Sequence, residues 1–447
     1  MPIRFSDHFT CKKLLKLTVP SVVMLIFTSV YGVVDGFFVS NFVGKSAFAA
    51  VNFILPVLMV LGAVGFMFGA GGSALIARTL GEGDPVRANR LFSMVVYLSL
   101  ICGAALTLLG LVLLRPLAVA LGAQGALLEN SLLYGYILLL ATPAYILQFE
   151  FQCLFATAGK PTLGLYVTVA AGLANMVLDA LFVAVLPWGL AGAAAATALS
   201  QCVGGIAPLV YFARPNKSLL RLCAARWQAR PLAKVCANGS SELMSNISIP
   251  LVSMLYNIQL LRYAGENGIA AYGVLMYMSM IFQAVFLGYS VGVAPAVSYH
   301  YGARNGPEVQ GILRRSLALV AATALAMFLA AQGLARPLSH LFVGYDPELL
   351  AMTQRAFRIF AFSFLFTGFA IFGSAYFTAL NNGAVSAAIS FARTLLFQVA
   401  AVLLLPLVWQ LDGVWAATVA AELLAAAVAG AFLCACRGGA PTREKKR

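Results

Sequence analysis

Apolar runs of about twenty residues recur along the whole chain and constrain its fold more than any other feature. Each run is long enough to cross a bilayer core of about 30 Å as an α-helix. A run in lipid must satisfy its own backbone hydrogen bonds, which favours helices over isolated strands. The composition agrees, because 62% of the residues are hydrophobic and only 10% are charged. We therefore predict an all-α integral membrane protein.

The apolar runs are separated by turn-forming groups such as Gly81-Glu-Gly-Asp-Pro85 and Gly159-Lys-Pro161. Counting between these breaks predicts twelve membrane-spanning helices, at residues 14–40, 49–77, 89–114, 127–157, 162–186, 190–212, 234–262, 269–300, 310–335, 349–379, 384–407 and 412–436.

The distribution of Lys and Arg predicts the orientation of these helices, since cytoplasmic loops carry the excess of both. Basic residues gather at the N-terminus, in the even-numbered connections and in the C-terminal tail, whereas the odd-numbered connections hold Lys45, Arg115, Arg262 and Arg336. We therefore expect a multi-pass protein of a bacterial inner membrane with both termini in the cytoplasm. The same pattern explains the net charge of +14 without a nucleic-acid partner.

The two halves of the chain repeat at an offset of about 221 residues. Gly71 and Gly81 recur as Gly292 and Gly302, and Trp188 recurs as Trp409. A duplicated unit with an even number of helices keeps its orientation, so the repeats are expected to be parallel. This predicts two six-helix bundles around a central cleft, with rocking of one against the other giving alternating access. The predicted domains are residues 1–212, a basic linker at 213–233, a second lobe at 234–436 and a basic tail at 437–447.

Polar residues within the apolar runs indicate where function resides, because an ionisable group in a membrane is costly to bury. Thr168, Gly172, Asn175 and Asp179 are spaced so that they share one helix face. Thr197 and Gln201 lie one turn apart on the next helix. In the first helix, Met24, Thr28, Tyr31, Asp35 and Phe38 share a face, and Pro20 can bend the helix. Carboxylates among neutral oxygens suit a sodium ion or a shared proton, and the competing interpretation is a fixed interhelical hydrogen bond.

Other ionisable residues within the runs have less defined roles. Glu150 is either a second titrating group or substrate contact, or a capped carboxylate. Glu242, in the polar opening of its predicted helix, is either a functional acid or a residue at the cytoplasmic interface, and the interface is the favoured alternative. Arg393 and Glu422 are predicted to form a buried ion pair in the second half. At the repeat offset, Asp35 corresponds to Tyr256, so the acids that would couple to an ion are concentrated in the first half.

The second half is rich in soft and aromatic side chains, among them Met276, Met280 and Phe366. Methionine adapts to ligands of varied shape, and aromatic faces attract organic cations. These residues are candidates for contact with substrate, and the alternative for each is packing against lipid or the core.

In its order of motifs the chain resembles the multidrug and toxic compound extrusion (MATE) family, nearest its bacterial DinF/MepA-like branch. The resemblance covers essentially the whole chain and is carried by Tyr31-Gly-Val-Val-Asp35, Gly71 to Gly81, Ala158-Gly159-Lys160-Pro161, Asn175-Met-Val-Leu-Asp179 and Arg393. It implies export of cationic or amphipathic small molecules in exchange for Na⁺ or H⁺. It further implies that Asp35, Asn175, Asp179 and Thr197 form the cation site and that Pro20 is the bending residue. The chain departs from the pattern at Asn381-Asn382-Gly383, where Gly-Lys-Pro is expected.

Two other functions compete with export. A flippase for lipid-linked sugars would need cationic residues to hold pyrophosphate, and Arg393 alone is well placed. An enzyme would need a nucleophile–base or metal constellation, but His8, His300 and His340 lie far apart and the eight cysteines are scattered. We expect no cofactor beyond the coupling ion, and as partners only small organic cations or amphipathic drugs and membrane lipids. We also expect a monomer.

Overall fold

The computed structural model describes residues 5–344 and 346–436, except for the side chains of residues 32, 33, 35–37, 40, 41, 45 and 341. Across these residues the regular secondary structure is entirely helical, as the sequence predicts. The helices are α1 Cys11–Phe38, η1 Val39–Val43, α2 Lys45–Gly81, α3 Pro85–Ala120, α4 Gly125–Leu140, α5 Thr142–Thr157, α6 Pro161–Asp179, η2 Ala180–Val185, α7 Gly189–Ala213, α8 Ala229–Gly302, α9 Gly306–Val343, α10 Pro347–Ala361, α11 Phe364–Ala379, α12 Gly383–Phe391, η3 Ala392–Leu396 and α13 Phe397–Cys436, where η marks a π-helical segment.

The number of membrane crossings agrees with the predicted twelve. In the described residues, eight helical stretches are long and apolar enough to span a bilayer, and two bent pairs, α4 with α5 and α10 with α11, each supply one more. Two of the eight stretches contain a reversal in which one residue leaves helical geometry, Gly265 in α8 and Gln410 in α13. Each of these stretches therefore crosses twice, which gives twelve spans in the described part of the chain.

Two of the predicted spans are bent rather than straight. The predicted helix at 127–157 is divided between α4 and α5, whose axes meet at 61°, and the one at 349–379 is divided between α10 and α11, which meet at 47°. Pro143 accounts for the first bend, because proline removes a backbone donor from the helix. The second bend, at Phe362 and Ser363, has no proline.

The connection between the two halves is shorter than the predicted linker. Residues 214–228 are not helical, and α8 already begins at Ala229. The physical reason is burial: Leu232 and Val235 pack in an apolar core with residues of the first half such as Phe212. Helix in this stretch therefore forms with tertiary support rather than as a free, solvated linker.

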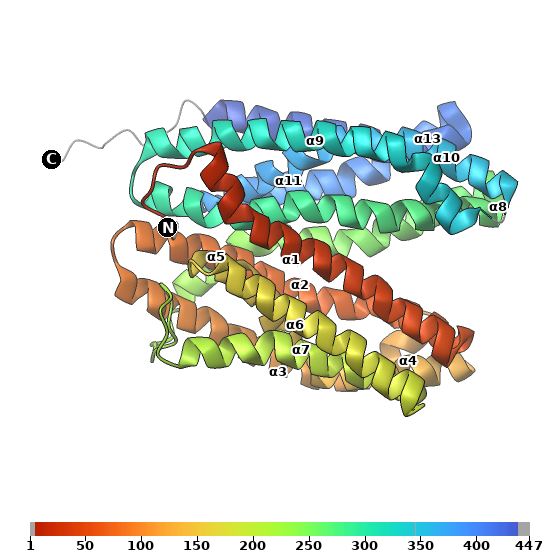
Figure 1. Ribbon diagram of the computed structural model, residues 1–447, viewed down its shortest axis with the longest axis horizontal. Helices are drawn as coiled ribbons and strands as arrows, with labels where there is room; N and C mark the ends of the chain where they lie inside the picture. The colour runs from red at the N-terminus through yellow and green to blue at the C-terminus, as the bar shows by residue number, and fades with distance from the viewer. Residues whose placement is uncertain (1–4, 345, 437–447) are drawn as a thin grey trace.

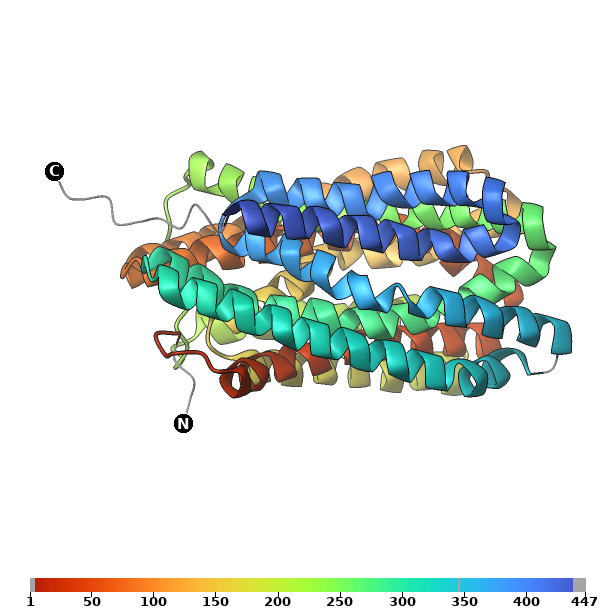
Figure 2. The same cartoon turned by 90° about the horizontal axis from the view of Figure 1, so that it is seen from above.

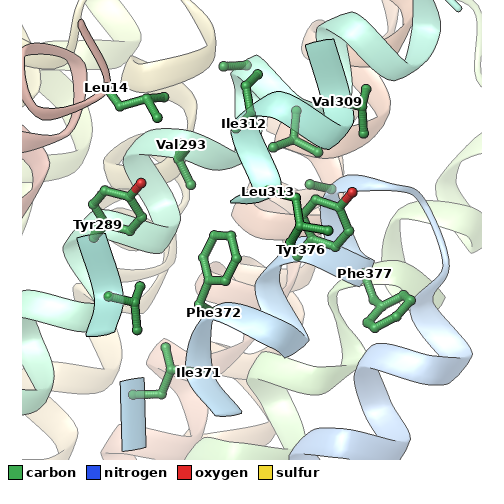
Figure 3. Close-up of a cluster of buried hydrophobic side chains, with 14 of the residues drawn as sticks. Leu14, Tyr289, Val293, Val309, Ile312, Leu313, Ile371, Phe372, Tyr376 and Phe377 are labelled. Atoms are coloured by element: carbon green, nitrogen blue, oxygen red, sulfur yellow. The ribbon is translucent and has the colours of Figure 1, made fainter. Parts of the chain in front are cut away.

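The first half of the chain, α1–α7, and the second half, α8–α13, form two bundles that lie against each other (Figure 1). We call them the first and second bundles. Helix α1 crosses diagonally between them. Leu14 near its start belongs to the apolar core of the second bundle, where it lies beside Val293 and Tyr289 (Figure 3). Helix α1 begins and α13 ends at the same end of the molecule, together with the turns at 82–84 and 303–305, and we call this the basic end (Figures 1 and 2).

Backbone-to-backbone contact joins the two bundles at the basic end. A Cβ atom added to Gly81 of α2 would lie 1.9 Å from the carbonyl oxygen of Tyr299 in α8. Likewise, a Cβ on Gly302 would lie 2.0 Å from the carbonyl oxygen of Arg78. Both residue pairs, Gly81 with Gly302 and Arg78 with Tyr299, match at the repeat offset of 221 residues. The contact is thus twofold symmetric, and only glycine lets the helices approach so closely.

Candidate ion-coupling site

The polar stripe predicted on α6 is buried and faces α1. Thr168, Gly172, Asn175 and Asp179 are all buried, and α6 packs along α1. A Cβ on Gly172 would meet the ring of Phe27 at 2.5 Å and that of Tyr31 at 3.0 Å. The absence of a side chain at Gly172 therefore lets the aromatic rings of α1 seat directly on the polar face of α6.

Both helices change from α to π geometry beside this stripe. Asp179 is the last residue of α6 and is fully buried, and η2 follows it directly. Asp35 lies in the last turn of α1, immediately before η1, and its side chain is outside the described residues. Segments η1 and η2 pack against each other. Isolated π turns are frequent at functional sites, and here they bring together the two backbone segments that carry the predicted acids.

Asn175 is the polar residue of the stripe with the clearest need for a ligand. Neither its Oδ1 nor its Nδ2 has a hydrogen-bond partner among the described residues, and both atoms are buried. A buried amide without partners costs about 1–3 kcal/mol. An amide oxygen in this position can serve as a neutral ligand to a small cation beside a carboxylate.

Helix α7 packs against α6 and carries the remaining predicted cation ligand, Thr197, and the candidate substrate or proton site Gln201. The Thr197 hydroxyl donates to the carbonyl oxygen of Ala193 at 3.1 Å, and a hydroxyl oxygen that donates can also accept a hydrogen bond or coordinate a cation. Gln201 is buried, and its Oε1 has no partner in the described part of the chain. Pro20 lies within α1, which is helical on both sides of it.

Glu150 lies inside the first bundle. It is fully buried on α5, and neither carboxylate oxygen has a hydrogen-bond partner by geometry among the described side chains. The Ser99 hydroxyl of α3 is near this carboxylate. Helix α2 also approaches closely, since a Cβ on Gly69 would lie 3.0 Å from the Glu150 Cα. A carboxyl group so placed can carry a proton or meet a cation, which are the two functional alternatives considered from the sequence.

The second bundle has the predicted ion pair. Arg393 Nε donates to both carboxylate oxygens of Glu422, at 3.0 and 2.9 Å, and the side chains are 13% and 4% exposed. Arg393 stands in the π segment η3 and also reaches Gln283 Oε1 at 3.5 Å. Because Glu422 holds this guanidinium, the flippase alternative loses the cation on which it depended.

At the second-bundle counterpart of the predicted cation site there is a closed hydrogen-bond network. The Tyr256 hydroxyl donates to Gln398 Oε1 at 2.9 Å and lies 2.9 Å from Thr418 Oγ1. At the repeat offset Tyr256 corresponds to Asp35 and Thr418 to Thr197. Gln398 lies in the part of the second half, residues 382–400, that corresponds to α6 at the repeat offset. Side chains at these three places therefore meet in the second bundle.

The predicted substrate contacts of the second bundle differ in their surroundings. Met276 packs against the apolar core around Tyr272 and Phe364. Phe366 is half-buried, and Met280 is exposed on α8. Their role as substrate contacts stays a prediction.

Two contacts between the bundles were not predicted from the sequence. One is the glycine contact of α2 with α8, although the paired glycines were visible as a repeat. The other joins the N-terminal segment to α9 through His8 and Glu308, which are 300 residues apart in sequence. No pattern in the sequence indicates that pairing.

Two repeated helical bundles that cross a membrane, each with a carboxylate buried in its interior, are typical of a polytopic membrane transporter. The family model described as MatE matches residues 20–181 and, a second time, residues 243–404. The chain therefore belongs to the MatE family, which confirms the predicted resemblance. Members of this family are transporters rather than enzymes.

Named relatives and solved structures agree with this assignment. The chain is 25% identical over 375 residues to the multidrug export protein MepA of Staphylococcus haemolyticus, covering 81% of this chain and 82% of that protein. It is 22% identical to MepA of Staphylococcus aureus, covering 80% of each. In fold it matches an outward-facing multidrug resistance MATE transporter with a TM-score of 0.90, at 24% identity and covering 96% of this chain and 98% of that one.

Proposed function

We propose that this protein is an antiporter that exports cationic or amphipathic small molecules in exchange for Na⁺ or H⁺. The observation that carries the proposal is the buried polar stripe of α6, where Asn175 has no partner among the described residues and Asp179 is fully buried. A group so costly to bury in a membrane protein marks an ion path or binding site. The names of the relatives, multidrug export proteins, support export as the direction of transport.

The coupling cation is proposed to bind among Asp35, Asn175, Asp179 and Thr197. The network of Tyr256, Gln398 and Thr418 supports this grouping, because two of its members correspond to Asp35 and Thr197 by the repeat. In the second bundle Tyr256, Gln398 and Thr418 hydrogen-bond to one another, and the nearby Glu422 is paired with Arg393. In the first bundle the corresponding region carries carboxylates, and a bound cation would balance their negative charge.

Transport is proposed to proceed by rocking of the two bundles. The symmetric contact of Gly81 and Gly302 closes the basic end, so this end must separate in the alternate state. Cation binding beside α1 and substrate binding would favour different arrangements, and that difference in affinity couples the two movements.

The substrate path is proposed to include Tyr31, Glu150 and Gln201 in the first bundle and Met276, Met280 and Phe366 in the second. Glu150 offers a negative charge to a cationic substrate, while the aromatic and thioether groups offer adaptable apolar contact.

The basic end is proposed to face the cytoplasm, so that both termini lie inside the cell. Lys and Arg of the even-numbered connections gather there, as cytoplasmic loops require. One chain contains both bundles, so we propose that the monomer suffices for transport.

The test is efflux of a fluorescent organic cation from proteoliposomes, with Na⁺ and H⁺ gradients imposed separately. Wild-type protein should respond to at least one gradient, and Asp179→Asn should lose that response while remaining folded. Glu266→Gln is the matched control, because Glu266 is exposed in the turn region of α8. A chain that moves no cation under either gradient, or an Asp179→Asn variant with wild-type efflux, would overturn the proposal.

A further inference from the structure

The segment that precedes α1 is bound to the basic end of the second bundle. Phe9 is fully buried and Phe5 nearly so, although both stand outside any helix. The Phe9 ring meets His300 edge-on with 5.9 Å between ring centroids, and Phe5 lies 6.0 Å from Tyr299. Two buried aromatic rings hold this segment on the last turn of α8.

The carboxylate of Glu308 binds this segment. Glu308 lies in the first turn of α9, where it accepts the Phe9 backbone N–H at 2.8 Å and interacts with His8 Nδ1 at 2.6 Å. Arg315 Nη1 lies 3.6 Å from Glu308 Oε1, the oxygen that accepts the Phe9 N–H. The His8 side chain itself is 62% exposed, whereas that of Glu308 is 10% exposed. Hydrogen bonds to a charged group are among the stronger ones in proteins.

Helix α1 connects this attachment on the second bundle to the first bundle. Near its start, α1 lies against α8, since a Cβ on Gly292 would lie 2.9 Å from the Thr18 Cα. Near its other end, α1 lies against α6 of the first bundle, with Tyr31 over Gly172. Helix α1 is therefore held at the basic end by the second bundle and at the polar stripe by the first.

We propose that Glu308 is a positioning residue of the transport cycle. It binds the N-terminal segment to the second bundle while α1 continues from that segment to the first bundle, and so stabilises the state that is closed at the basic end. The inference rests on the proposed function in one respect, namely that the bundles separate at this end during transport. When they separate, the start of α1 must leave α8 and α9, and the contacts of Glu308 with His8 and Phe9 are lost. Glu308 thereby sets the balance between the two states without touching substrate or ion.

The test measures the distance between spin labels at Val86 and Gln310 in the full chain, with its native cysteines replaced. Both positions are exposed at the basic end, one at the start of α3 and the other at the start of α9. Glu308→Ala should raise the ratio of long to short distances by about tenfold, since it removes hydrogen bonds to a charged group. His8→Ala, which changes an exposed side chain, should shift the ratio in the same direction by less.

Glu348→Ala is the matched control, because Glu348 also lies in the first turn of a helix but is exposed on α10. It should leave the distances unchanged. Wild-type distances in both Glu308→Ala and His8→Ala would overturn the inference, and if Glu308→Ala does not fold, His8→Ala decides alone. The labels are read without substrate or gradient, so this result is independent of whether export itself is observed.

Discussion

Tyr256 and Thr418 lie 2.9 Å apart through their hydroxyl oxygens in the second bundle, at positions that correspond to Asp35 and Thr197 in the first. The duplicated scaffold thus brings the same two helix positions together with different chemistry. In the second bundle the pair is completed by Gln398 and needs no ligand. The proposed division of labour follows from this difference, with structural support in one bundle and ion coupling in the other.

Tyr256→Phe should lower stability and leave ion coupling intact. The substitution leaves Gln398 Oε1 without its donor and the Thr418 hydroxyl without its partner, which costs about 1–3 kcal/mol for a buried group. Thermal unfolding of the purified protein measures the loss, with Tyr277→Phe, an exposed tyrosine, as the control. If the variant instead kept its stability and lost its response to Na⁺ and H⁺ gradients, the second bundle would share in coupling.

Asn175→Leu should weaken binding of the coupling cation without lowering stability. Because the amide has no partner among the described residues, its removal should leave stability unchanged or raise it. Affinity for the coupling cation should fall by about tenfold or more, as expected when a strong polar ligand is lost. Unfolding temperature as a function of Na⁺ concentration and of pH measures both effects. Asn52→Leu, on the exposed surface of α2, is the control, and equal cation stabilisation in Asn175→Leu and wild type would contradict the assignment.

Gly302→Ala should disfavour the state that is closed at the basic end. The added methyl group would lie 2.0 Å from the Arg78 carbonyl oxygen, so α2 and α8 must move apart. The label pair at Val86 and Gln310 should report longer distances. Gly273→Ala is the matched control in the same helix, because its Cβ would meet nothing within 4 Å. Unchanged distances in Gly302→Ala would show that the contact is not needed for closure.

Arg393→Gln should destabilise the protein strongly, by about 3–5 kcal/mol, because it leaves the buried Glu422 charge unpaired. Replacing both residues, as Arg393→Met with Glu422→Leu, should recover most of the loss. Arg355→Gln provides the comparison, since its pair with Asp412 is exposed and should contribute under about 1 kcal/mol. Chemical or thermal unfolding ranks the three proteins. A double variant as unstable as Arg393→Gln would point to a role for Gln283 or other neighbours of the pair.

Much of the fold could be predicted from the sequence because a bilayer permits few kinds of backbone structure. The apolar runs had to be helices, and the constant offset that links Gly81 to Gly302 reveals the repeat in the sequence itself. The bend at Phe362 and Ser363 could not be predicted, since no proline or glycine stands at it.

The candidate site was predicted in part. The spacing of Asn175 and Asp179 correctly placed them on one buried face, because helix periodicity determines which residues share a face. The same reasoning could not separate lipid-exposed from buried residues among the aromatic and methionine side chains, and Met280 is exposed. The contact between His8 and Glu308 could not be predicted, because it depends on how distant parts of the chain are placed in the fold and no local sequence pattern determines that.

The contact of Gly81 with Tyr299 and of Gly302 with Arg78 has a consequence for the origin of the chain. The contact is isologous, which means that corresponding surface residues of the two halves contact each other. Two separate copies of a single six-helix ancestor would meet in this same way. The meeting surface can therefore have existed as a homodimer interface before fusion joined the copies, after which each was free to specialise.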